Sequence, residues 1–282
     1  MKINIIVDSG ADYTAKEIEE YGLKVIPLKV SFGEETFLDG VDITIEEFFK
    51  RLKGSSVLPK TSQISPYDYE TEFEKIKEAG EQAIVVTISS GLSGCFQSAR
   101  IAAGKYKDMI RVVDSKSVSL GERIVVQRAM DLIAAGKDLS ETESVLNEEI
   151  KKIKTIAALD TLTYLKKGGR LSTTAFLAGS LLALKPIVQV VDGRVEFVCT
   201  ARGHRKVHSA LNKVIEKAGQ IDKNMPRSLA YSDTDRSILD NFVAALPELF
   251  ANDIDAYQEA AIGPAIGTHI GPGAVAIAYF EK

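Results

Sequence analysis

Cysteine and histidine are both scarce in this sequence, and their spacing argues against two kinds of site. The two cysteines, Cys95 and Cys199, are far apart and form no C-x-x-C pair. Because their neighbours are apolar, we expect buried thiols in a reducing compartment and no structural disulfide. The three histidines supply one i, i+4 pair, His204 and His208, and no H-E-x-x-H motif. A metal site is therefore the weakest functional hypothesis.

Long apolar runs and an excess of positive charge are also missing. The most apolar window, Ala175–Leu184, contains Ser180 and is far shorter than the ~18 apolar residues that a membrane-spanning helix needs. The first apolar run, Ile3–Val7, is too short for the core of a signal peptide. A net charge of -4 and a pI near 5.6 argue against a nucleic-acid-binding protein. We therefore expect a cytoplasmic protein that acts through a localised site.

What the sequence does contain is the composition of an ordinary folded protein. It has 282 residues, of which 45% are hydrophobic and 26% are charged, enough to build one large core or two smaller ones. We detect no internal repeat and no low-complexity tract. We predict an N-terminal α/β domain over residues 1–155 and a C-terminal mixed α/β domain over residues 156–282.

Three apolar runs in the first half predict strands of a parallel sheet. These runs are Ile3–Val7, Ala83–Ile88 and Ile110–Val113, and helical patterns follow the first two. Ligands of open α/β sheets usually bind beyond the carboxyl ends of the strands. This rule places Asp8–Ser9 and Ser89–Gly94 on one rim, where we expect the site.

The helices of the first half carry start signals of their own. Thr14 and Thr44 are well placed as N-caps, since Glu17 and Glu47 follow three residues later. The predicted helices cover Thr14–Tyr21, Thr44–Lys53, Pro66–Ala79, Ser93–Lys105, Ser119–Ala135 and Leu139–Lys152.

Beyond Lys152 the pattern changes to one typical of antiparallel strands. Ile187–Val191 and Arg194–Cys199 are joined by Asp192-Gly193, which is the signature of a type I′ hairpin. A second pair of strands is predicted around Leu229–Ser232 and Ala274–Phe280, with a helix from Ser237 to Phe250 between them. The second half therefore predicts a mixed sheet.

The segment Ser89–Ala99 runs from the end of a predicted strand into a predicted helix. Exposed backbone N–H groups and the helix dipole at such a start attract an anion, and Ser93 is the side chain best placed to contact it. Taken alone, Ser93 is more often only the N-cap of the helix. The two roles are compatible with each other.

The polar loop Lys60–Pro66 offers a second set of hydroxyl groups before a helix. Thr61 and Ser62 can donate hydrogen bonds to an anion. The alternative, favoured on the loop alone, is that Thr61 or Ser65 merely caps the helix. The loop gains importance if it converges with the segment around Ser93 on one ligand.

His269 lies between glycines, with Gly267 before it and Gly271 and Gly273 after it. Because glycine has no side chain, other groups can approach His269 closely. A lone histidine is more often a structural residue than a ligand contact, and that interpretation holds here only if the glycines serve turns alone. We favour a binding role.

Three cations flank Gly168-Gly169, and they differ in what they predict. Lys166 and Lys167 are best interpreted as solvated surface charges, whereas Arg170 is equally suited to reach inward. The apolar segment Ala175–Leu184 that follows predicts burial. It is either a central core helix or, through its small residues, a wall that leaves room for a ligand tail.

Taken in order along the chain, these segments resemble the DegV family, whose members include fatty acid binding proteins that serve bacterial fatty acid kinases. The resemblance covers nearly the whole chain. It implies a two-domain α/β fold with a largely parallel N-terminal sheet, a mixed C-terminal sheet and an acyl chain between them. The motifs that carry it are Val7–Ser9, Lys60–Pro66, Ser89–Ala99, Val113–Ser117, Leu165–Ser172, Lys185–Ile187 and Gly267–Ala274.

The resemblance also implies which residues meet the ligand. Burying a carboxylate costs several kcal/mol unless hydrogen-bond donors satisfy it. The residues that contact the carboxylate would therefore offset its desolvation, while the acyl tail would supply the affinity. No cofactor is implied besides the bound fatty acid. One departure is Cys95-Phe96, where the family often has a Thr-Tyr or Thr-Phe pair. The matching positions are Thr61, Ser93 and His269 for the carboxylate, with Ser62, the Gly94 backbone and Arg170 beside them.

The function that the resemblance implies is that of a carrier and not of an enzyme. The carrier would present the acyl carboxylate to a separate ATP-dependent kinase, and this sequence has no G-x-x-x-x-G-K-[ST] loop of its own. Relatives face partners with a basic run near residues 200–208. Arg202, Arg205 and Lys206 keep much of that charge, which implies kinase docking and transient contact with an anionic membrane, whereas His204 and His208 depart from the run.

A serine hydrolase is the alternative from another functional class. Gly91-Leu92-Ser93-Gly94-Cys95 nearly matches G-x-S-x-G, and His269 follows far downstream. The fifth position is cysteine instead of glycine, and no Asp or Glu stands out as the acid that a triad needs. The sequence therefore favours the carrier.

Overall fold

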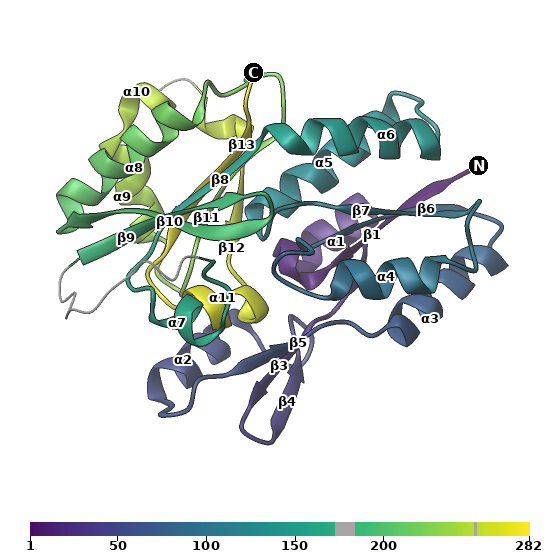
Figure 1. Cartoon of the computed structure of the whole chain (residues 1–282), viewed down its shortest axis with the longest axis horizontal. Coiled ribbons are helices and arrows are strands. Elements are labelled where there is room, and N and C mark those ends of the chain that lie inside the picture. Colours follow the sequence, from purple (N-terminus) through teal and green to yellow (C-terminus); the bar gives the residue numbers. More distant parts are fainter. Residues whose placement is uncertain (173–183, 251–252) are drawn as a thin grey trace.

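Two sheets organise the chain, and each is built from a different part of the sequence (Figure 1). A computed structural model describes residues 1–172, 184–250 and 253–282, with the backbone alone at 204 and 205. The strands of the first sheet lie within residues 3–114 and those of the second within residues 153–280. Residue 155 lies inside a strand of the second sheet, and a domain boundary there stays a prediction.

The first sheet is parallel throughout, as the alternation of apolar runs and helices predicts. Its residues alternate between two faces: Ile6 and Val85 pack with α3 and α4, while Val7 and Val86 pack with α5 and α6. Helices therefore cover both faces. The strands in sheet order are β2 (Lys24–Ile26), β1 (Ile3–Asp8), β6 (Gln82–Thr87) and β7 (Ile110–Asp114).

The helices of the first half start where their capping residues predict. Thr14 forms a full capping box with Glu17, and Thr44 accepts a hydrogen bond from the Glu47 backbone N–H. Ser65 caps the helix that begins at Pro66. The helices are α1 (Ala15–Tyr21), α2 (Ile45–Gly54), α3 (Pro66–Glu78), α4 (Cys95–Ala103), α5 (Leu120–Ala134) and α6 (Leu139–Glu149), with 3-10 turns η1 (Ser9–Ala11) and η2 (Ile150–Lys152).

A small antiparallel sheet of three strands, which the sequence did not predict, is formed by segments between β2 and α3. Its central strand is β3 (Lys29–Phe32), flanked by β4 (Glu35–Leu38) and β5 (Lys60–Ser62). Thr61 stands opposite Val30 in this sheet. The polar loop Lys60–Pro66 is therefore partly a strand.

The second sheet is mixed, as predicted, with one parallel pair of strands. Asp192 and Gly193 both have positive φ, at 48° and 77°, as the predicted type I′ hairpin requires. The predicted pair Leu229–Ser232 and Ala274–Phe280 is antiparallel. The strands in sheet order are β10 (Arg194–Arg202), β9 (Leu184–Val191), β8 (Ile153–Ala158), β13 (Val275–Phe280), β11 (Arg227–Tyr231) and β12 (Tyr257–Ala261).

The two faces of β13 carry side chains of different size. Val275, Ile277 and Tyr279 pack into the outer core with the helices of the second half, whereas Ala276 and Ala278 face the core shared with the first sheet. Up to Phe280, which ends the strand, small residues therefore line the inner face. The helices of the second half are α7 (Thr163–Lys167), α8 (His204–Ala218), α9 (Ser237–Ala245), α10 (Pro247–Phe250) and α11 (Pro264–Ile270), with the 3-10 turn η3 (Ile254–Ala256).

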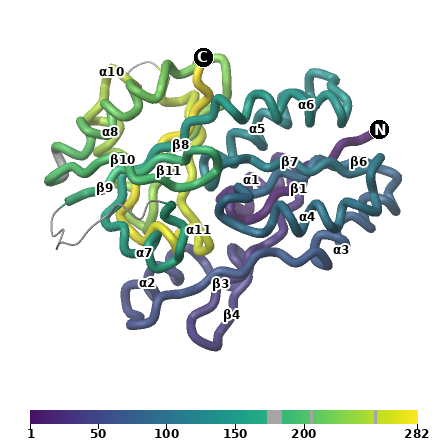
Figure 2. The backbone as a smooth tube through the Cα atoms, viewed as in Figure 1, coloured from purple at the N-terminus to yellow at the C-terminus, as the bar shows by residue number. Residues whose placement is uncertain are grey.

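Helix α11 comes from the end of the chain but packs among elements from its beginning. Figure 2 shows this yellow helix close to the purple segments of α2 and β3, which it contacts together with β5, η1 and α7. The tip of the β9–β10 hairpin makes a second link, because Ser89 Oγ donates to the carbonyl of Gly193 at 2.7 Å. Distant parts of the sequence thus meet at the carboxyl ends of the first sheet.

Buried carboxyl groups near this junction should make stability depend on pH. Burial raises the pKa of Asp8 to about 7, that of Asp12 to about 8 and that of Asp39 to about 6. Raised carboxyl pKa values stabilise the fold at pH below the unfolded value near 3.8, and the effect is lost as pH rises through about 6 to 8. We therefore expect the free energy of unfolding to be about 1–2 kcal/mol larger at pH 6.5 than at pH 8. The melting temperature should be a few degrees higher at pH 6.5.

Differential scanning calorimetry at constant ionic strength measures this shift. The pH window avoids His269, whose pKa is lowered and which acts in the opposite direction only below pH 6.5. An Asp12→Asn variant should show a flatter dependence, because the pKa of Asp12 lies within this window. A melting temperature that falls between pH 8 and pH 6.5 would contradict the prediction.

Candidate functional site

A cavity of about 380 Å³ lies beyond the carboxyl ends of the first sheet, where it meets the second. Its walls come from the segments that follow β2, β6 and β7, and from β5, α7, β10 and α11. This volume is within the range of small-molecule sites. Its polar lining residues are Thr61, Ser62, Gln63, Ser93, Arg170 and His269.

Thr61 and His269 form a direct pair in this cavity although 208 positions separate them. Thr61 Oγ1 lies 2.8 Å from His269 Nε2, within hydrogen-bonding distance. In the tautomer that carries its proton on Nε2, the ring donates to Thr61, and the Thr61 hydroxyl can donate to a ligand oxygen. The pair therefore suits an anionic oxygen.

The imidazole of His269 is neutral at neutral pH. Burial, and then the positive charge of Arg170, lower its pKa from 6.5 to about 4. Its Nδ1 is buried and has no hydrogen-bond partner among the residues that the structure describes. A carboxylate bound at this point would supply the negative charge that the site lacks.

Two glycines allow the polar groups of the cavity to approach the backbone closely. A Cβ atom on Gly168 would lie 2.4 Å from His269 Nδ1, and one on Gly94 would lie 1.8 Å from Gln63 Oε1. Any larger residue at either position would displace these side chains. Gly94 is thus required by its neighbours as well as being part of the cavity wall.

Ser93 lines the cavity and also contacts the start of α4. The helix begins at Cys95, two residues later than predicted, and Gly94 occupies the N-cap position. The hydroxyl of Ser93 donates to Cys95 Sγ at 3.1 Å and accepts from the Cys95 backbone N–H at 3.3 Å, so the two roles of Ser93 are compatible. Of the two capping candidates in the loop Lys60–Pro66, Ser65 caps α3 and Thr61 does not.

Arg170 reaches inward and lines the same cavity. Its Nε donates to the carbonyl of Leu92 at 3.2 Å, and its Nη1 donates to the carbonyl of Gly168 at 2.6 Å. These bonds fix the guanidinium beside the pair of Thr61 and His269. Lys166 and Lys167, in contrast, are exposed at the end of α7, as predicted.

The cavity adjoins a smaller apolar space of about 50 Å³ on the inner face of the second sheet. The two spaces share five wall residues, and together we call them the elongated void. Ala157, Ala274 and Ala276 line only the far space, where their small side chains leave room. The shared residues are Val118, Leu165, Val195, Ile266 and Ile270.

Comparison with known proteins gives this geometry a family. The family model described as "Uncharacterised protein, DegV family" matches residues 2–282. The chain belongs to the DegV family. A DegV domain-containing protein from Caldanaerobacter subterraneus is 32% identical to it over 282 residues, which are 100% of this chain and 99% of that protein.

Solved structures of DegV proteins agree with the fold described above. A fatty-acid-binding DegV family protein from Thermus thermophilus is 30% identical, with a TM-score of 0.88 and full coverage of both chains. A stearic-acid-binding protein from Eubacterium ventriosum is 27% identical, with a TM-score of 0.88, and the match covers 100% of this chain and 99% of that one. The predicted fold class is thus confirmed.

Several residues of this DegV site were missed in the sequence. Gln63 lies in the polar loop Lys60–Pro66, and its side-chain amide donates to Ser98 Oγ at 3.0 Å. The apolar walls come from single residues of separate segments, such as Leu28, Ile88 and Val118, which no local pattern connects. The expected wall in the apolar segment after Arg170 falls mostly on residues 173–183, which lie outside the described residues.

The geometry does not assemble the catalytic triad of a serine hydrolase. Ser93 Oγ is bonded to Cys95, and His269 Nε2 is bonded to Thr61. No carboxylate among the described residues accepts from His269 Nδ1, and the lowered pKa makes this imidazole a weak base. Ser93 and His269 thus share a cavity without the contacts that the hydrolase hypothesis requires.

The remaining sequence predictions concern the surface of this DegV chain. Arg202, at the end of β10, and Lys206, in α8, are exposed, and the side chain of Arg205 lies outside the described residues. Within residues 1–172, 184–250 and 253–282, no group of three His, Cys, Asp or Glu side chains could hold a metal ion. None of the described helices combines the length and hydrophobicity that crossing a bilayer requires.

Proposed function

We propose that this DegV protein binds one long-chain fatty acid in the elongated void. The observation that carries the proposal is the polarity of that void: hydroxyl, imidazole and guanidinium groups gather at one end, and apolar side chains line the other. Fatty acid binding by the Thermus thermophilus and Eubacterium ventriosum relatives supports it.

The tail should supply most of the affinity and the polar end should set the orientation. Burying about 14 methylene groups at ~0.8 kcal/mol each gives roughly 11 kcal/mol before association costs are subtracted. The carboxylate would be received by Thr61, Ser93 and His269, because leaving it without donors would cost several kcal/mol. Ser62, the Gly94 backbone and Arg170 complete this end of the site.

We further propose that the protein acts as a cytoplasmic carrier and not as an enzyme. It would present the carboxylate to a separate ATP-dependent fatty acid kinase, which would transfer the γ-phosphoryl group of ATP to a carboxylate oxygen, forming an acyl phosphate and releasing ADP. The exposed Arg202 and Lys206, together with Arg205, would face this kinase or, transiently, an anionic membrane surface. Charge reversal at Arg202 should then slow acyl phosphate formation without releasing the fatty acid.

Mass spectrometry of the purified protein tests the proposal directly. An organic extract should contain close to one fatty acid per chain after expression in a lipid-replete host. Native spectra should show the same mass difference. Clean absence of lipid, together with failure to take up added oleate, would contradict fatty acid binding.

A Ser93→Ala variant separates the carrier from a hydrolase. In a carrier, loss of this hydroxyl should weaken retention of the fatty acid by a modest factor, because only one of several donors is removed. In a hydrolase, the same change would abolish turnover of an ester probe. Turnover by the wild-type protein that disappears in the variant would favour the hydrolase.

A further inference from the structure

We propose that Asp12 and Asp39, two buried carboxyl groups outside the cavity, act as positioning residues that hold helix α11 so that His269 meets the ligand carboxylate. This inference rests on the proposed function. Neither residue lines the cavity, and their exposed fractions are 7% and 5%. Sequence motifs drew attention to Asp8 and Ser9 but to neither of these two residues.

Asp12 contacts the start of α11 directly. Its Oδ1 accepts from the backbone N–H of Gly263 at 2.9 Å, and Gly263 immediately precedes the helix. Its Oδ2 accepts from Ser119 Oγ, at the start of α5. Asp12 therefore ties α11 to an element that packs against both sheets.

Asp39 approaches the same helix end from another direction, and its Oδ1 would lie 3.4 Å from a Cβ atom on Gly263. Burial raises the pKa of the Asp39 carboxyl, and hydrogen bonds from Ser9 and from the backbone of Ala265 lower it. Asp39 Oδ2 also accepts from Ser9 Oγ at 2.7 Å, and Ser9 Oγ accepts from the backbone N–H of Leu28 at 3.0 Å. Leu28 is a wall residue of the cavity, so this chain of bonds links the wall to α11.

Gly263 shows that both carboxyl groups converge on one point. A Cβ atom there would lie 2.9 Å from Asp12 Oδ1 and 3.4 Å from Asp39 Oδ1. Only a residue without a side chain lets two carboxyl groups approach the helix start so closely. Carboxyl oxygens at this end also accept from backbone N–H groups that have no partner within the helix.

Helix α11 needs such support because it is short. Its seven residues make few hydrogen bonds within the helix, so its direction depends on what holds its ends. His269 follows Gly263 by six positions, which is about 9 Å along a helix axis. A small tilt at the start would therefore move the imidazole away from Thr61.

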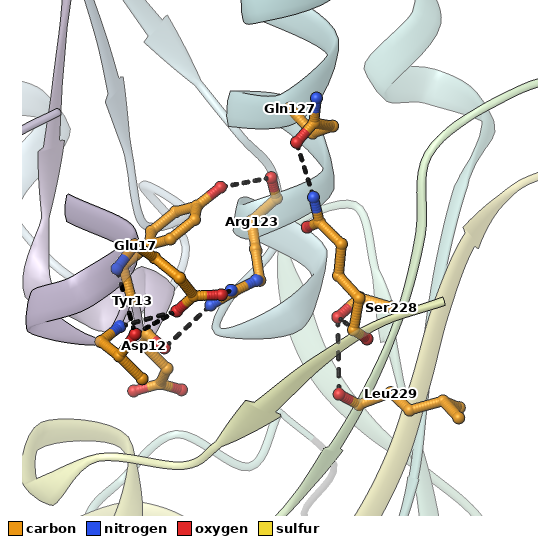
Figure 3. Close-up of polar contacts among 9 residues, drawn as sticks. Asp12, Tyr13, Glu17, Arg123, Gln127, Ser228 and Leu229 are labelled. Carbon is orange, nitrogen blue, oxygen red and sulfur yellow. Dashed lines mark hydrogen bonds and ion pairs between the residues drawn. The ribbon is translucent and has the colours of Figure 1, made fainter. Parts of the chain in front are cut away.

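Asp12 is itself held by a rigid buried group. Arg123, fully buried in α5, donates from Nη1 to the backbone carbonyl of Asp12 at 3.0 Å. Its guanidinium lies 4.1 Å from the centre of the Tyr13 ring and pairs with Glu17. Figure 3 shows this arrangement, with Arg123 between Glu17 and the backbone of Asp12.

The experiment compares ligands that differ only in the headgroup. Binding of palmitate and of hexadecanol is measured for the wild type, Asp39→Ala and Asp12→Ala. We expect both variants to lose roughly 10-fold or more of the preference for palmitate, because a displaced His269 no longer serves the carboxylate. Affinity for hexadecanol should stay within about 3-fold, because the apolar walls are unchanged. Asp39→Asn, which keeps a carbonyl oxygen as acceptor, should restore part of the preference.

Glu17→Gln is the matched control. It weakens the pair with Arg123 on the far side of Asp12 and should lower the melting temperature by several degrees. It leaves the contacts of Asp12 and Asp39 with α11 in place, so the preference for palmitate should match that of the wild type. If this control lost the preference for palmitate equally, lower stability alone would explain the effect, and the inference would be overturned.

The NMR signals of the His269 ring give a readout that needs no ligand. They should shift in Asp39→Ala and Asp12→Ala, as the bond to Thr61 changes, and stay unchanged in Glu17→Gln. Wild-type signals together with wild-type ligand preference in both aspartate variants would overturn the inference. If the wild-type protein binds no palmitate, the proposed function fails, and the His269 signals still decide whether the two carboxyl groups position the helix.

Discussion

Replacing Thr61 with valine and His269 with alanine together should lower the affinity for palmitate by roughly 10-fold to 150-fold. The bonded pair has one hydrogen-bond donor left for the charged carboxylate, which is worth about 1.5–3 kcal/mol. Valine keeps the shape of threonine and removes only its donor. Isothermal titration calorimetry, or displacement of a fluorescent fatty acid, measures the change.

The single variants and an uncharged ligand make this result interpretable. Because Thr61 and His269 are bonded at 2.8 Å, we expect their effects to be non-additive, with each single change already disturbing the other residue. Hexadecanol should bind the double variant almost as well as the wild type. Wild-type affinity for palmitate in the double variant would place the carboxylate elsewhere.

Replacing Ala276 with leucine should shorten the acyl chain that the protein accepts. Ala276 lines the far apolar space, and three added carbon atoms there would displace about three methylene groups of a long tail. At ~0.8 kcal/mol each, this lowers the affinity for stearate by roughly 50-fold. Laurate, which is six carbons shorter, should bind with nearly unchanged affinity in a competition assay.

Ala278→Leu provides the matched control for this change. Ala278 lies on the same strand and the same inner face, is equally buried, and lines neither part of the void. Both variants should lose stability through overpacking, by about 1–3 kcal/mol. Only Ala276→Leu should change the ratio of stearate to laurate affinity. Equal ratios in the two variants would show that the tail does not reach Ala276.

Much of the fold could be predicted because its signals are local. Thr14 and Thr44 mark helix starts within a few residues of sequence, and Asp192-Gly193 marks a hairpin through the backbone angles that it requires. The small sheet of β3, β4 and β5 was missed, since strands of three or four residues give no clear alternation. Helix α11 was missed as well, because its glycines and Pro264 are typical of loops.

The candidate site was predictable at its polar end and hidden at its apolar end. Thr61, Ser93, Arg170 and His269 stand in motifs rich in glycine and hydroxyl groups, and the structure brings all four to one cavity. The far walls include single alanines from separate segments, and strand pairing, such as that of Ala157 with Ala276, brings them together. The partners of α11 were equally hidden, because Asp12 and Gly263 are 251 positions apart.

Large and small residues alternate along most of β13, so one face of the strand packs against helices while the other leaves space for a ligand. Val275, Ile277 and Tyr279 anchor the outer helices, while Ala274 and Ala276 border the void. Selection can therefore enlarge or trim inward residues and retune which lipids are accepted, with little change to the scaffold on the opposite side. A family built on such a strand can diversify its cargo through single substitutions while its architecture stays constant.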